Sequence, residues 1–327
     1  MFDNLRKKIA YALNGEPNSN SPKKTVPISP SITENMVRLR EQFPNSSDLN
    51  KREMEIGKSK ILLLSCEGMI NAQTLALSII KPLSELEGDR VYSGRDICDF
   101  IMHKSILSVE QREIFDFDTL FTAMMSGFVI ILIEGEQIAF ALAAHGFQFR
   151  SISEPSNEAN ELGPKEAFTE PLRINLSMVR RRIKSPKLRF ELMSVGAQSK
   201  TDLCLIYLSD RASPKLIKEV RKKLKKINLD VILDSSYVRP YLENHPFSLF
   251  SSVGNTERPD VLCGKINEGR IAVLVDGSPY ALIVPFLFGE NFKSFDDYAR
   301  RPYFSTFVRI LKYLSFYISF LLPGAYV

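Results

Sequence analysis

The feature that most constrains the fold is a pattern that occurs twice in the chain. A short apolar run at Ile61–Cys66 precedes a helical stretch, and a similar run at Leu203–Leu208 precedes another. Continuous apolar runs of this length are typical of buried strands. A shift of 142 positions aligns the starts of the two runs, and the same shift takes Leu75 in the first helical stretch to Ile217 in the second.

Each half then continues with a helix, a strand, an acidic-Gly turn and a second strand. In the first half these are Asp116–Ser126, Phe128–Ile133, Glu134–Gly135 and Gln137–Ala143; in the second, the strand, turn and strand are Ile271–Val275, Asp276–Gly277 and Tyr280–Val284. Six aligned residues are identical at this shift, namely Asp118/Asp260, Leu120/Leu262, Gly127/Gly269, Leu132/Leu274, Gly135/Gly277 and Ala139/Ala281. We interpret the pattern as a duplicated α/β subdomain, which requires the same strand order and connectivity in both halves.

Composition and charge exclude several classes of protein. Hydrophobic residues make up 44% of the 327 residues, charged residues 25%, and the mean hydropathy is -0.08. These ordinary globular values exclude a disordered chain, a collagen-like chain and a chain that is mostly membrane. At roughly 100–200 residues per domain, the length predicts two domains or one large one. The formal charge of +5 is too weak to indicate nucleic-acid binding.

Between the halves, a polar linker leads into a long amphipathic helix. We expect this helix to begin with Pro164 at its first position and to end before Pro186. Two further helices are expected at Ala72–Ile80, ending at Pro82, and at Pro214–Ile227.

The two ends of the chain differ from its globular middle. Residues 1–36 are rich in Pro, Ser and Asn, which predicts a flexible polar tail. From Tyr313 to Val327 no residue is charged, and a bilayer span needs about 20 apolar residues. We therefore expect a first transmembrane segment that is incomplete in this chain. By the positive-inside rule, four basic residues just before it place the globular part in the cytoplasm: Arg300, Arg301, Arg309 and Lys312.

The expected fold class is therefore α/β, with two related small α/β subdomains followed by a C-terminal transmembrane helix. The expected domains are a flexible tail at 1–36, a first subdomain at 37–148, a linker helix and second subdomain at 149–292, a basic juxtamembrane segment at 293–305 and the membrane segment at 306–327.

The motifs of common enzymes and metal sites do not occur. Gly57–Lys58–Ser59 resembles the end of a phosphate-binding loop, but Arg52 replaces the first glycine and a strand follows, so we expect a strand-connecting turn. The sequence has no G-x-S-x-G nucleophile elbow and no C-x-x-C pair. The three histidines, none of which has a metal-ligand partner at suitable spacing, are His103, His145 and His245. We expect no catalysis, no metal and no cofactor, and mostly buried, reduced thiols at Cys66, Cys98, Cys204 and Cys263.

Two basic runs stand out on expected helices, Arg173–Arg189 and Lys215–Lys226. A solvated face, an anionic membrane surface and RNA each account for such runs. Few aromatic residues interleave with the charges, and a membrane segment is expected to follow, which together favour lipid headgroups or an acidic partner over RNA.

An ordered set of short motifs identifies a family. The motifs are Ser153–Glu154–Pro155, Gly163–Pro164–Lys165, Phe168–Thr169–Glu170, Arg180–Arg181–Arg182–Ile183, Thr256–Glu257–Arg258–Pro259–Asp260, Glu268–Gly269–Arg270 and Val275–Asp276–Gly277–Ser278–Pro279. In this order they resemble the GerA family, the A-type subunits of spore germinant receptors, from about residue 60 to the end. Leu162 and Ser251 depart from the family pattern, which usually has Arg and Pro at these positions.

The resemblance implies a receptor subunit without enzymatic activity. Such subunits lie in the spore inner membrane with their soluble part on the core side, and they act with a multispanning B-type subunit and a C-type lipoprotein. A-type subunits are thought to form a homo-oligomeric, ion-conducting assembly, so the resemblance implies membrane and protein partners and no nucleic acid. Family members continue through further membrane helices, so we expect this chain to be a fragment or a truncated product.

The family motifs supply the candidate site residues. We expect an interdomain or intersubunit charge network, rather than a catalytic site, at Glu154, Glu170, Arg180, Arg181, Arg182, Glu257, Arg258 and Asp260. Turn or structural roles are expected for Gly163, Pro164, Gly269, Asp276, Gly277 and Pro279. Two alternatives stay open: direct nutrient binding in a cleft between the subdomains, and a basic protein that binds nucleic acid.

Overall fold

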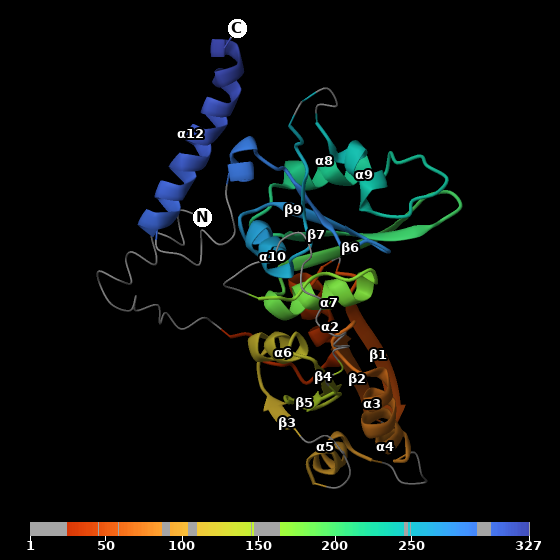
Figure 1. Cartoon of the computed structure of the whole chain (residues 1–327). Coiled ribbons are helices and arrows are strands. Elements are labelled where there is room, and N and C mark those ends of the chain that lie inside the picture. The colour runs from red at the N-terminus through yellow and green to blue at the C-terminus, as the bar shows by residue number, and fades with distance from the viewer. Residues whose placement is uncertain are drawn as a thin grey trace. The chain divides into compact units, whose positions relative to one another are not determined.

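The structure is a computed structural model of the whole chain (Figure 1). It describes residues 25–44, 46–57, 59–86, 92–103, 110–144, 146, 164–244, 248, 250–292 and 302–326. The described residues form two compact units. The first unit takes its residues from Met1–Gln42, Asn50–Cys66 and Ile70–His145, and the second from Phe43–Leu49, Glu67–Met69 and Gly146–Val327.

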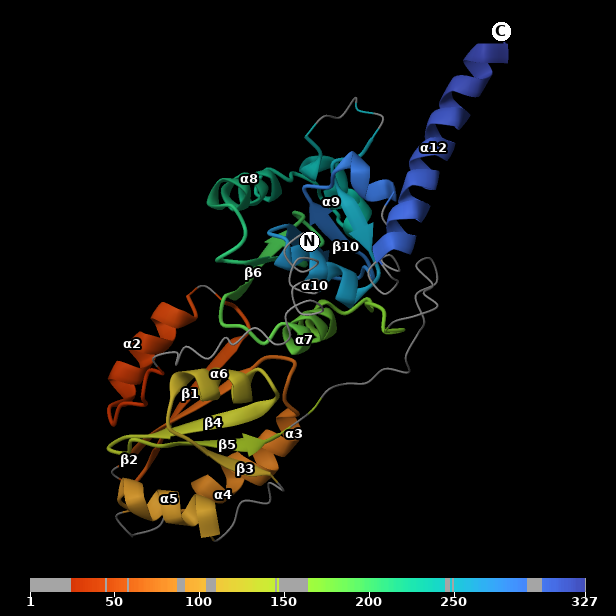
Figure 2. The same ribbon diagram turned by 90° about the vertical axis from the view of Figure 1, so that its left-hand side faces the viewer.

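The first unit is a five-stranded sheet with helices on both faces. Its strands lie in the order β1-β2-β4-β5-β3, and Figure 2 shows α2 and α6 on one face with α3, α4 and α5 on the other. The strands are β1 (Leu49–Ile56), β2 (Ser59–Cys66), β3 (Gln111–Ile114), β4 (Phe128–Ile133) and β5 (Ala139–Ala143). The helices are α2 (Ile32–Gln42), α3 (Ala72–Thr74), the π-helix η1 (Leu75–Ile80), α4 (Lys81–Ser84), α5 (Gly94–His103) and α6 (Phe117–Met124).

The second unit has the same kind of architecture. Its strands lie in the order β6-β7-β9-β10-β8, with α7 and α10 on one face of the sheet and α8 and α9 on the other (Figure 1). The strands are β6 (Leu188–Val195), β7 (Thr201–Leu208), β8 (Gly254–Thr256), β9 (Ile271–Val275) and β10 (Ala281–Val284). The helices are α7 (Leu172–Arg182), α8 (Pro214–Leu224), α9 (Ser235–Leu242), α10 (Pro259–Asn267), the 3-10 helix η2 (Phe288–Phe292) and α12 (Pro302–Tyr326).

The duplication is confirmed by strand order and by register. Replacing β1 to β5 by β6 to β10 turns the first strand order into the second. Ile61 pairs with Ile133 in the first sheet, and Leu203 pairs with Val275 in the second, both members being shifted by 142 positions. The same shift holds where β5 pairs with β3 and β10 pairs with β8. Residue-by-residue pairing therefore repeats across three neighbouring strand pairs of each sheet.

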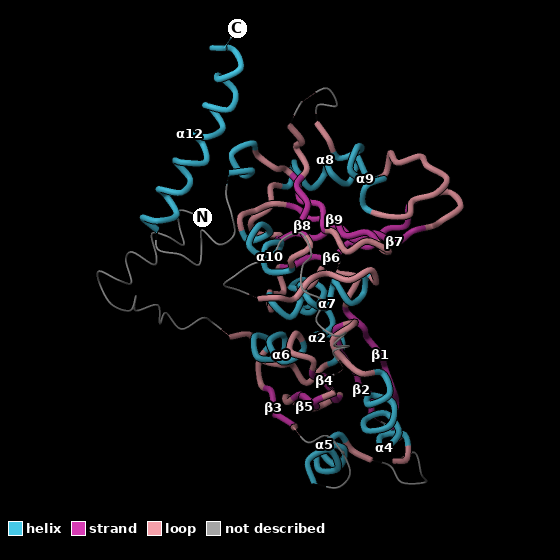
Figure 3. The backbone as a smooth tube through the Cα atoms, viewed as in Figure 1, coloured by secondary structure: helices cyan, strands magenta, loops and turns pink. Residues whose placement is uncertain are grey.

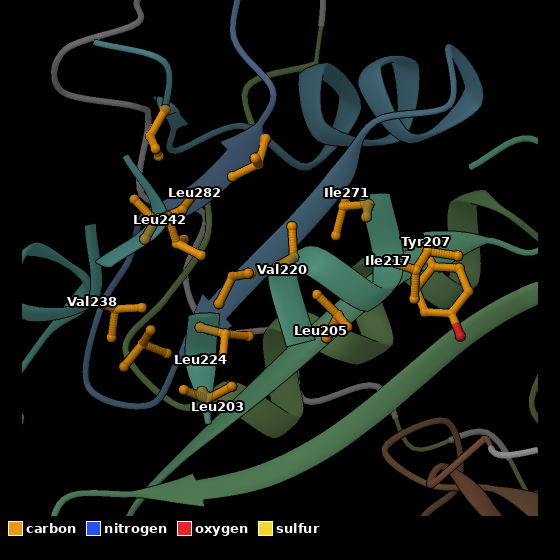
Figure 4. Packing of buried hydrophobic residues seen from close by; sticks show 14 of the residues in the cluster. Leu203, Leu205, Tyr207, Ile217, Val220, Leu224, Val238, Leu242, Ile271 and Leu282 are labelled. Carbon is orange, nitrogen blue, oxygen red and sulfur yellow. The ribbon is translucent and has the colours of Figure 1, made fainter. Parts of the chain in front are cut away.

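The core of the second unit explains why its central strand is a continuous apolar run. Side chains on β9 alternate between faces, so Ile271 and Val273 join the cluster beneath α8 and α9, whereas Leu274 joins the cluster beneath α7 and α10. Figure 4 shows the first of these clusters, in which Val220 and Leu224 of α8 point onto the sheet. A strand covered on both faces excludes water from both sets of side chains, which favours apolar residues throughout.

Two turns need glycine in both units. Gly127 and Gly269 have φ angles of 90° and 89°, and Gly135 and Gly277 have φ angles of 91° and 82°. Residues with a Cβ are strained at such angles. At Gly269 an added Cβ would also lie 2.8 Å from the carbonyl oxygen of Arg211. These repeated turns account for the glycines that the sequence pattern shares between the halves.

Helix boundaries differ from the sequence-based expectation at two prolines. Pro164 is not the first residue of a helix, because residues 164–171 run as irregular chain and α7 begins only after Pro171. The helical stretch expected to end at Pro82 continues to Ser84. The turn before Pro82 is π-helical, and the N–H of Lys81 donates to the carbonyl of Ala76, five residues back. This wider turn accommodates the proline ring.

The described part of the first unit includes residues that precede the predicted boundary at residue 37. Helix α2 begins at Ile32, and Ile28 N donates to the carbonyl oxygen of Phe115 at 2.9 Å. Pro27 forms a β-bridge with Asp116. Residues 1–24 of the predicted tail, the linker at 147–163 and the basic segment at 293–301 lie outside the described residues.

The C-terminal element α12 is one continuous helix (Figure 3). Among the described residues it is the helix with a window, Tyr303–Leu322, long and apolar enough to cross a membrane by length and composition. Only 6% of that window is buried inside the structure. An apolar helix with so little protein around it matches the expected C-terminal membrane segment.

Candidate functional site: the charged face of α7 and α10

In each unit the same set of hydrogen bonds holds the start of one helix, α2 in the first unit and α7 in the second. We call this set the helix-start device, and several family-motif residues take part in it. Buried Asn175 accepts a hydrogen bond from Thr169 N at 2.8 Å and donates to Thr169 O. Asp276 accepts from Leu172 N at 2.8 Å, which caps α7, and Gly277 N donates to the carbonyl of Glu170 at 2.9 Å. These contacts give Glu170, Asp276 and Gly277 a structural position at the start of α7.

The first unit repeats each contact. Buried Asn35 accepts from Ser29 N at 2.9 Å and donates to Ser29 O at 2.6 Å. Glu134 accepts from Ile32 N at 2.9 Å, and Gly135 N donates to Pro30 O at 2.8 Å. The device therefore belongs to the duplicated fold rather than to one half.

Arg180 is the centre of a buried polar cluster in the second unit. Its side chain is 1% exposed, and its Nε donates to Asp48 at 2.8 Å. The guanidinium carbon lies 4.4 Å from the ring centroid of Phe190 and 5.2 Å from that of Phe43. Nη1 donates to the carbonyl of Ser185 at 3.1 Å. The cluster thus satisfies the charge with one carboxylate, carbonyl oxygens and two aromatic faces.

The two arginines that follow share one acid. Arg181 and Arg182 donate to the two oxygens of Glu166 at 2.5 and 2.6 Å. Burial alone would raise the pKa of Glu166, but the hydrogen bonds and charges of Arg182 and Arg181 together lower it. All three side chains remain 20–30% exposed. This triad therefore keeps its charge at neutral pH while facing solvent.

The motif at the start of α10 forms a two-point ion pair. Arg258 Nη2 and Nε donate to the two oxygens of Asp260 at 2.7 and 3.1 Å, and the Arg258 side chain is 3% exposed. Asp260 lies in the first turn of α10, and its side chain binds Arg258 there. The carbonyl of buried Glu257 accepts from Phe168 N at 2.7 Å.

These residues lie on neighbouring helices. Helices α7 and α10 pack against each other on the same face of the second sheet (Figure 1). Burial raises the pKa of Cys263 to about 12, and the charges of both Arg182 and Asp260 reach this thiol. We call the surface formed by Glu166, Arg181, Arg182, Arg258 and Asp260 the motif face. The structure thus brings four of the predicted charges together, while Arg180 binds Asp48 instead.

Two further ionic clusters join residues that no sequence motif marks. Glu290 in η2 is 5% exposed and accepts hydrogen bonds from Lys265 and Arg270, both at 2.6 Å. Glu191 on β6 binds Arg221 of α8 at 2.7 and 2.9 Å. The sequence separations within these pairs run from 20 to 30 residues, so no local spacing marks them.

The remaining predicted residues have plainer positions. Glu154 and Gly163 lie outside the described residues, and Pro279 lies in the loop between β9 and β10. Gly57 forms the expected turn between β1 and β2, with a φ of 61°. The structure contains no group of three or more metal-ligand side chains among the residues it describes. The four cysteines are free; three are buried and Cys263 is partly exposed.

The fold and the motif face define a class: a duplicated α/β protein that carries an apolar C-terminal helix. Comparison with known proteins identifies the family within this class. The profile described as Bacillus/Clostridium GerA spore germination protein matches residues 37–327. The chain therefore belongs to the GerA family, as the ordered motifs predict.

Individual relatives agree with this assignment. Spore germination protein KA of Bacillus subtilis is 36% identical over 303 residues, which cover 92% of this chain and 55% of the relative. Spore germination protein B1 of the same organism is 34% identical over 305 residues, covering 92% of this chain and 62% of the relative. The chain thus spans somewhat more than half the length of these relatives.

A solved structure matches the fold. It is the N-terminal domain of the A subunit of the Bacillus megaterium spore germinant receptor GerK3, with a TM-score of 0.63 and 30% sequence identity. The match covers 81% of this chain and 99% of that domain. The mixed α/β fold class predicted from the sequence is confirmed.

Proposed function

We propose that this chain is the cytoplasmic-side region and first membrane segment of a spore germinant receptor A subunit. It acts in nutrient-triggered germination by assembling subunits and by passing a conformational change to an ion-conducting membrane part. Membership of the GerA family and likeness to a solved A-subunit domain support this proposal. The role is non-enzymatic and needs no cofactor.

The observation that carries the proposal is the charge placed on and beneath the motif face. A buried or half-buried ion pair adds little net stability compared with apolar residues of the same volume, because both charges lose their hydration. Such pairs act better as devices for orientation and specificity, which a subunit interface needs. The Glu166–Arg181–Arg182 triad is partly exposed and can exchange partners when another chain approaches.

The proposed partners follow from the family. They are B-type multispanning and C-type lipoprotein subunits, further copies of the A subunit, and the membrane that receives α12. The proposed location is the spore inner membrane, with both α/β units on the core side. Two such units that change their angle would supply the two-state element that a gated receptor requires.

The test replaces Arg258 by alanine at the native locus. We expect Arg258→Ala to block the nutrient response or to lower the receptor level, because Asp260 then keeps an unpaired charge in a half-buried place. The matched control is Arg112→Ala, whose ion pair with Glu110 has side chains 60% and 46% exposed. Spore germination and receptor immunoblots provide the measurement. Normal receptor levels together with a normal nutrient response in Arg258→Ala spores would refute the assignment.

A further inference from the structure

An aromatic cluster joins the second α/β unit to helix α12. Phe292 of η2 stacks on Tyr313 of α12 with ring centroids 4.3 Å apart and lies 5.4 Å from Phe316. Phe288, also in η2, lies 5.7 Å from Phe316 and 4.5 Å from Phe250. These rings connect α12 to η2 by side-chain packing in addition to the chain between them.

Helix η2 is in turn fixed to the α/β unit. Between its two aromatic residues lies buried Glu290, which is held by Lys265 at the end of α10 and Arg270 beside β9. Gly289 leaves no spare room, since an added Cβ would lie 3.3 Å from the Tyr313 hydroxyl. The aromatic cluster is therefore a defined joint, with an ionic anchor on one side and the apolar helix on the other.

The outer side of this joint is apolar and exposed. Phe250 is 48% exposed, Leu287 is 56% exposed and Phe288 is 40% exposed. Phe288 contacts Phe316 of α12, so this exposed apolar side lies beside the apolar helix; we call Phe250, Leu287 and Phe288 the η2 patch. Exposed apolar surface that continues from a membrane helix is typical of a region that touches lipid.

The charges on α12 limit how deep the joint can lie. Lys312 falls at the middle of the apolar window Tyr303–Leu322, and a charge at the bilayer centre costs several kcal/mol, roughly 3 on insertion scales. A window centred there would also bring Glu290, Lys265 and Arg270 close to the hydrocarbon. The more favourable depth puts Lys312 in the headgroup layer, where its side chain reaches water and lipid phosphates.

With Lys312 at this depth, the positions of the other α12 residues in the bilayer follow from helix geometry. At 1.5 Å per residue, Tyr317 to Tyr326 then extend roughly 15 Å toward the middle of a hydrocarbon core about 30 Å thick. Tyr313 and Phe316 fall at the boundary between headgroups and acyl chains, the depth at which aromatic side chains gather. Phe288 of the η2 patch lies at the same level, because its ring contacts Phe316, and the ring of Phe250 contacts Phe288 in turn.

We infer that the η2 patch is a second membrane contact, in which Phe250, Leu287 and Phe288 rest in the headgroup–acyl boundary beside α12. The bilayer surface lies at the level of Lys312–Phe316. The inference rests on the proposed membrane role of α12 and adds a lipid-binding surface on the α/β unit itself. Its partner is the lipid bilayer, and not another protein chain.

The experiment uses the absence of tryptophan from the whole chain, so that each introduced tryptophan reports alone. Phe250→Trp and Phe288→Trp are made in the full 327-residue chain and reconstituted in phosphatidylcholine–phosphatidylglycerol vesicles. The lipids carry bromine either near the carbonyl end or near the methyl end of the acyl chains. Leu321→Trp places a tryptophan on the part of α12 expected to lie inside the membrane. Phe115→Trp is the control, because Phe115 is 59% exposed on the first unit. Circular dichroism confirms that each variant folds.

The two patch variants are expected to show blue-shifted emission and stronger quenching by the shallow bromine than by the deep one. Leu321→Trp should show the opposite order, and Phe115→Trp should not be quenched. Quenching of Leu321→Trp without quenching of either patch variant would overturn the inference while leaving the membrane helix in place. Blue-shifted but unquenched patch variants would mean that protein covers the patch, which also overturns it. A lack of quenching in all variants would overturn the membrane role itself.

Discussion

The two α/β units share one register but differ in where they bury charge. Arg40 and Arg180 occupy the same position in the equivalent eleven-residue helices α2 and α7. Arg40 is exposed, whereas Arg180 is buried against Asp48 and two aromatic rings. The fold forms with either arrangement, so the buried charge of the second unit is an addition to the fold rather than a requirement of it.

The N-cap positions of the equivalent helices α6 and α10 show the same contrast. In the first unit, Asp116 caps α6 by accepting from Thr119 N at 2.9 Å. In the second unit the equivalent residue is Arg258, whose side chain turns to Asp260. Where the first unit has an acid that caps a helix, the second unit has a cation that forms an ion pair on the motif face. The proposed receptor role depends on this ion pair, which the first unit does not have at the equivalent position.

The largest expected effect comes from breaking the buried pair. Arg180→Ala should lower the free energy of unfolding of the second unit by about 3–5 kcal/mol, because Asp48 is left buried without its partner. Arg40→Ala should change the first unit by no more than about 0.5 kcal/mol, as an exposed substitution does. Native-state hydrogen exchange of β9 and β4 amides measures the two units in one experiment. Equal effects at the two positions would break the comparison.

A smaller effect should be the same in both units. Asn35→Ala and Asn175→Ala each remove a buried side chain that binds both backbone groups of one residue. Each should cost about 1–3 kcal/mol in its own unit, because Ser29 or Thr169 loses its partners. The same exchange measurement checks this. A loss confined to one unit would mean that the shared helix-start device is equivalent in geometry but not in energy.

The smallest expected effect is a dependence on pH. Burial alone would raise the pKa of Glu191, but hydrogen bonds from Arg221 and Tyr207 outweigh it and hold the pKa below the usual 4.5. A lowered carboxyl pKa contributes stability that is present above pH 4.5 and is lost as the pH falls through the folded-state value. Glu191→Gln should therefore flatten the fall in thermal unfolding temperature below pH 4.5. Glu110→Gln, in an exposed pair of the first unit, is the control; an unchanged acid slope in Glu191→Gln would contradict the prediction.

The central elements were predictable because burial on both faces leaves an unambiguous signal. Phe128–Ile133 and Ile271–Val275 are apolar throughout, and the structure places strands at those residues. Two of the edge strands gave no such signal: β1 reads LNKREMEI with five of its eight residues exposed, and β8 has only three residues. Polar outward positions on an edge strand resemble loop or helix sequence.

The candidate site was predictable only in part. The motif arginines and Asp260, the partner of Arg258, could be named from the sequence. The acids that bind Arg180 and Arg181 could not, since Asp48 lies 132 residues from Arg180 and Glu166 lies 15 residues from Arg181. Glu166 also falls within the helix expected to begin at Pro164, so the sequence does not indicate that it binds these arginines. Phe168 N and Leu172 N are bound by Glu257 and Asp276, so tertiary hydrogen bonds hold the preceding segment in an irregular path.

The proposed role in germination of the charges found in the second unit is best tested at Glu166. Glu166→Gln keeps the shape of the side chain and removes the charge that Arg181 and Arg182 share at a partly exposed site. Introduced at the native locus, it should leave hydrogen exchange of β9 and the receptor level nearly unchanged while the spores lose most of their nutrient response. A full nutrient response from Glu166→Gln spores with normal receptor levels would contradict the account.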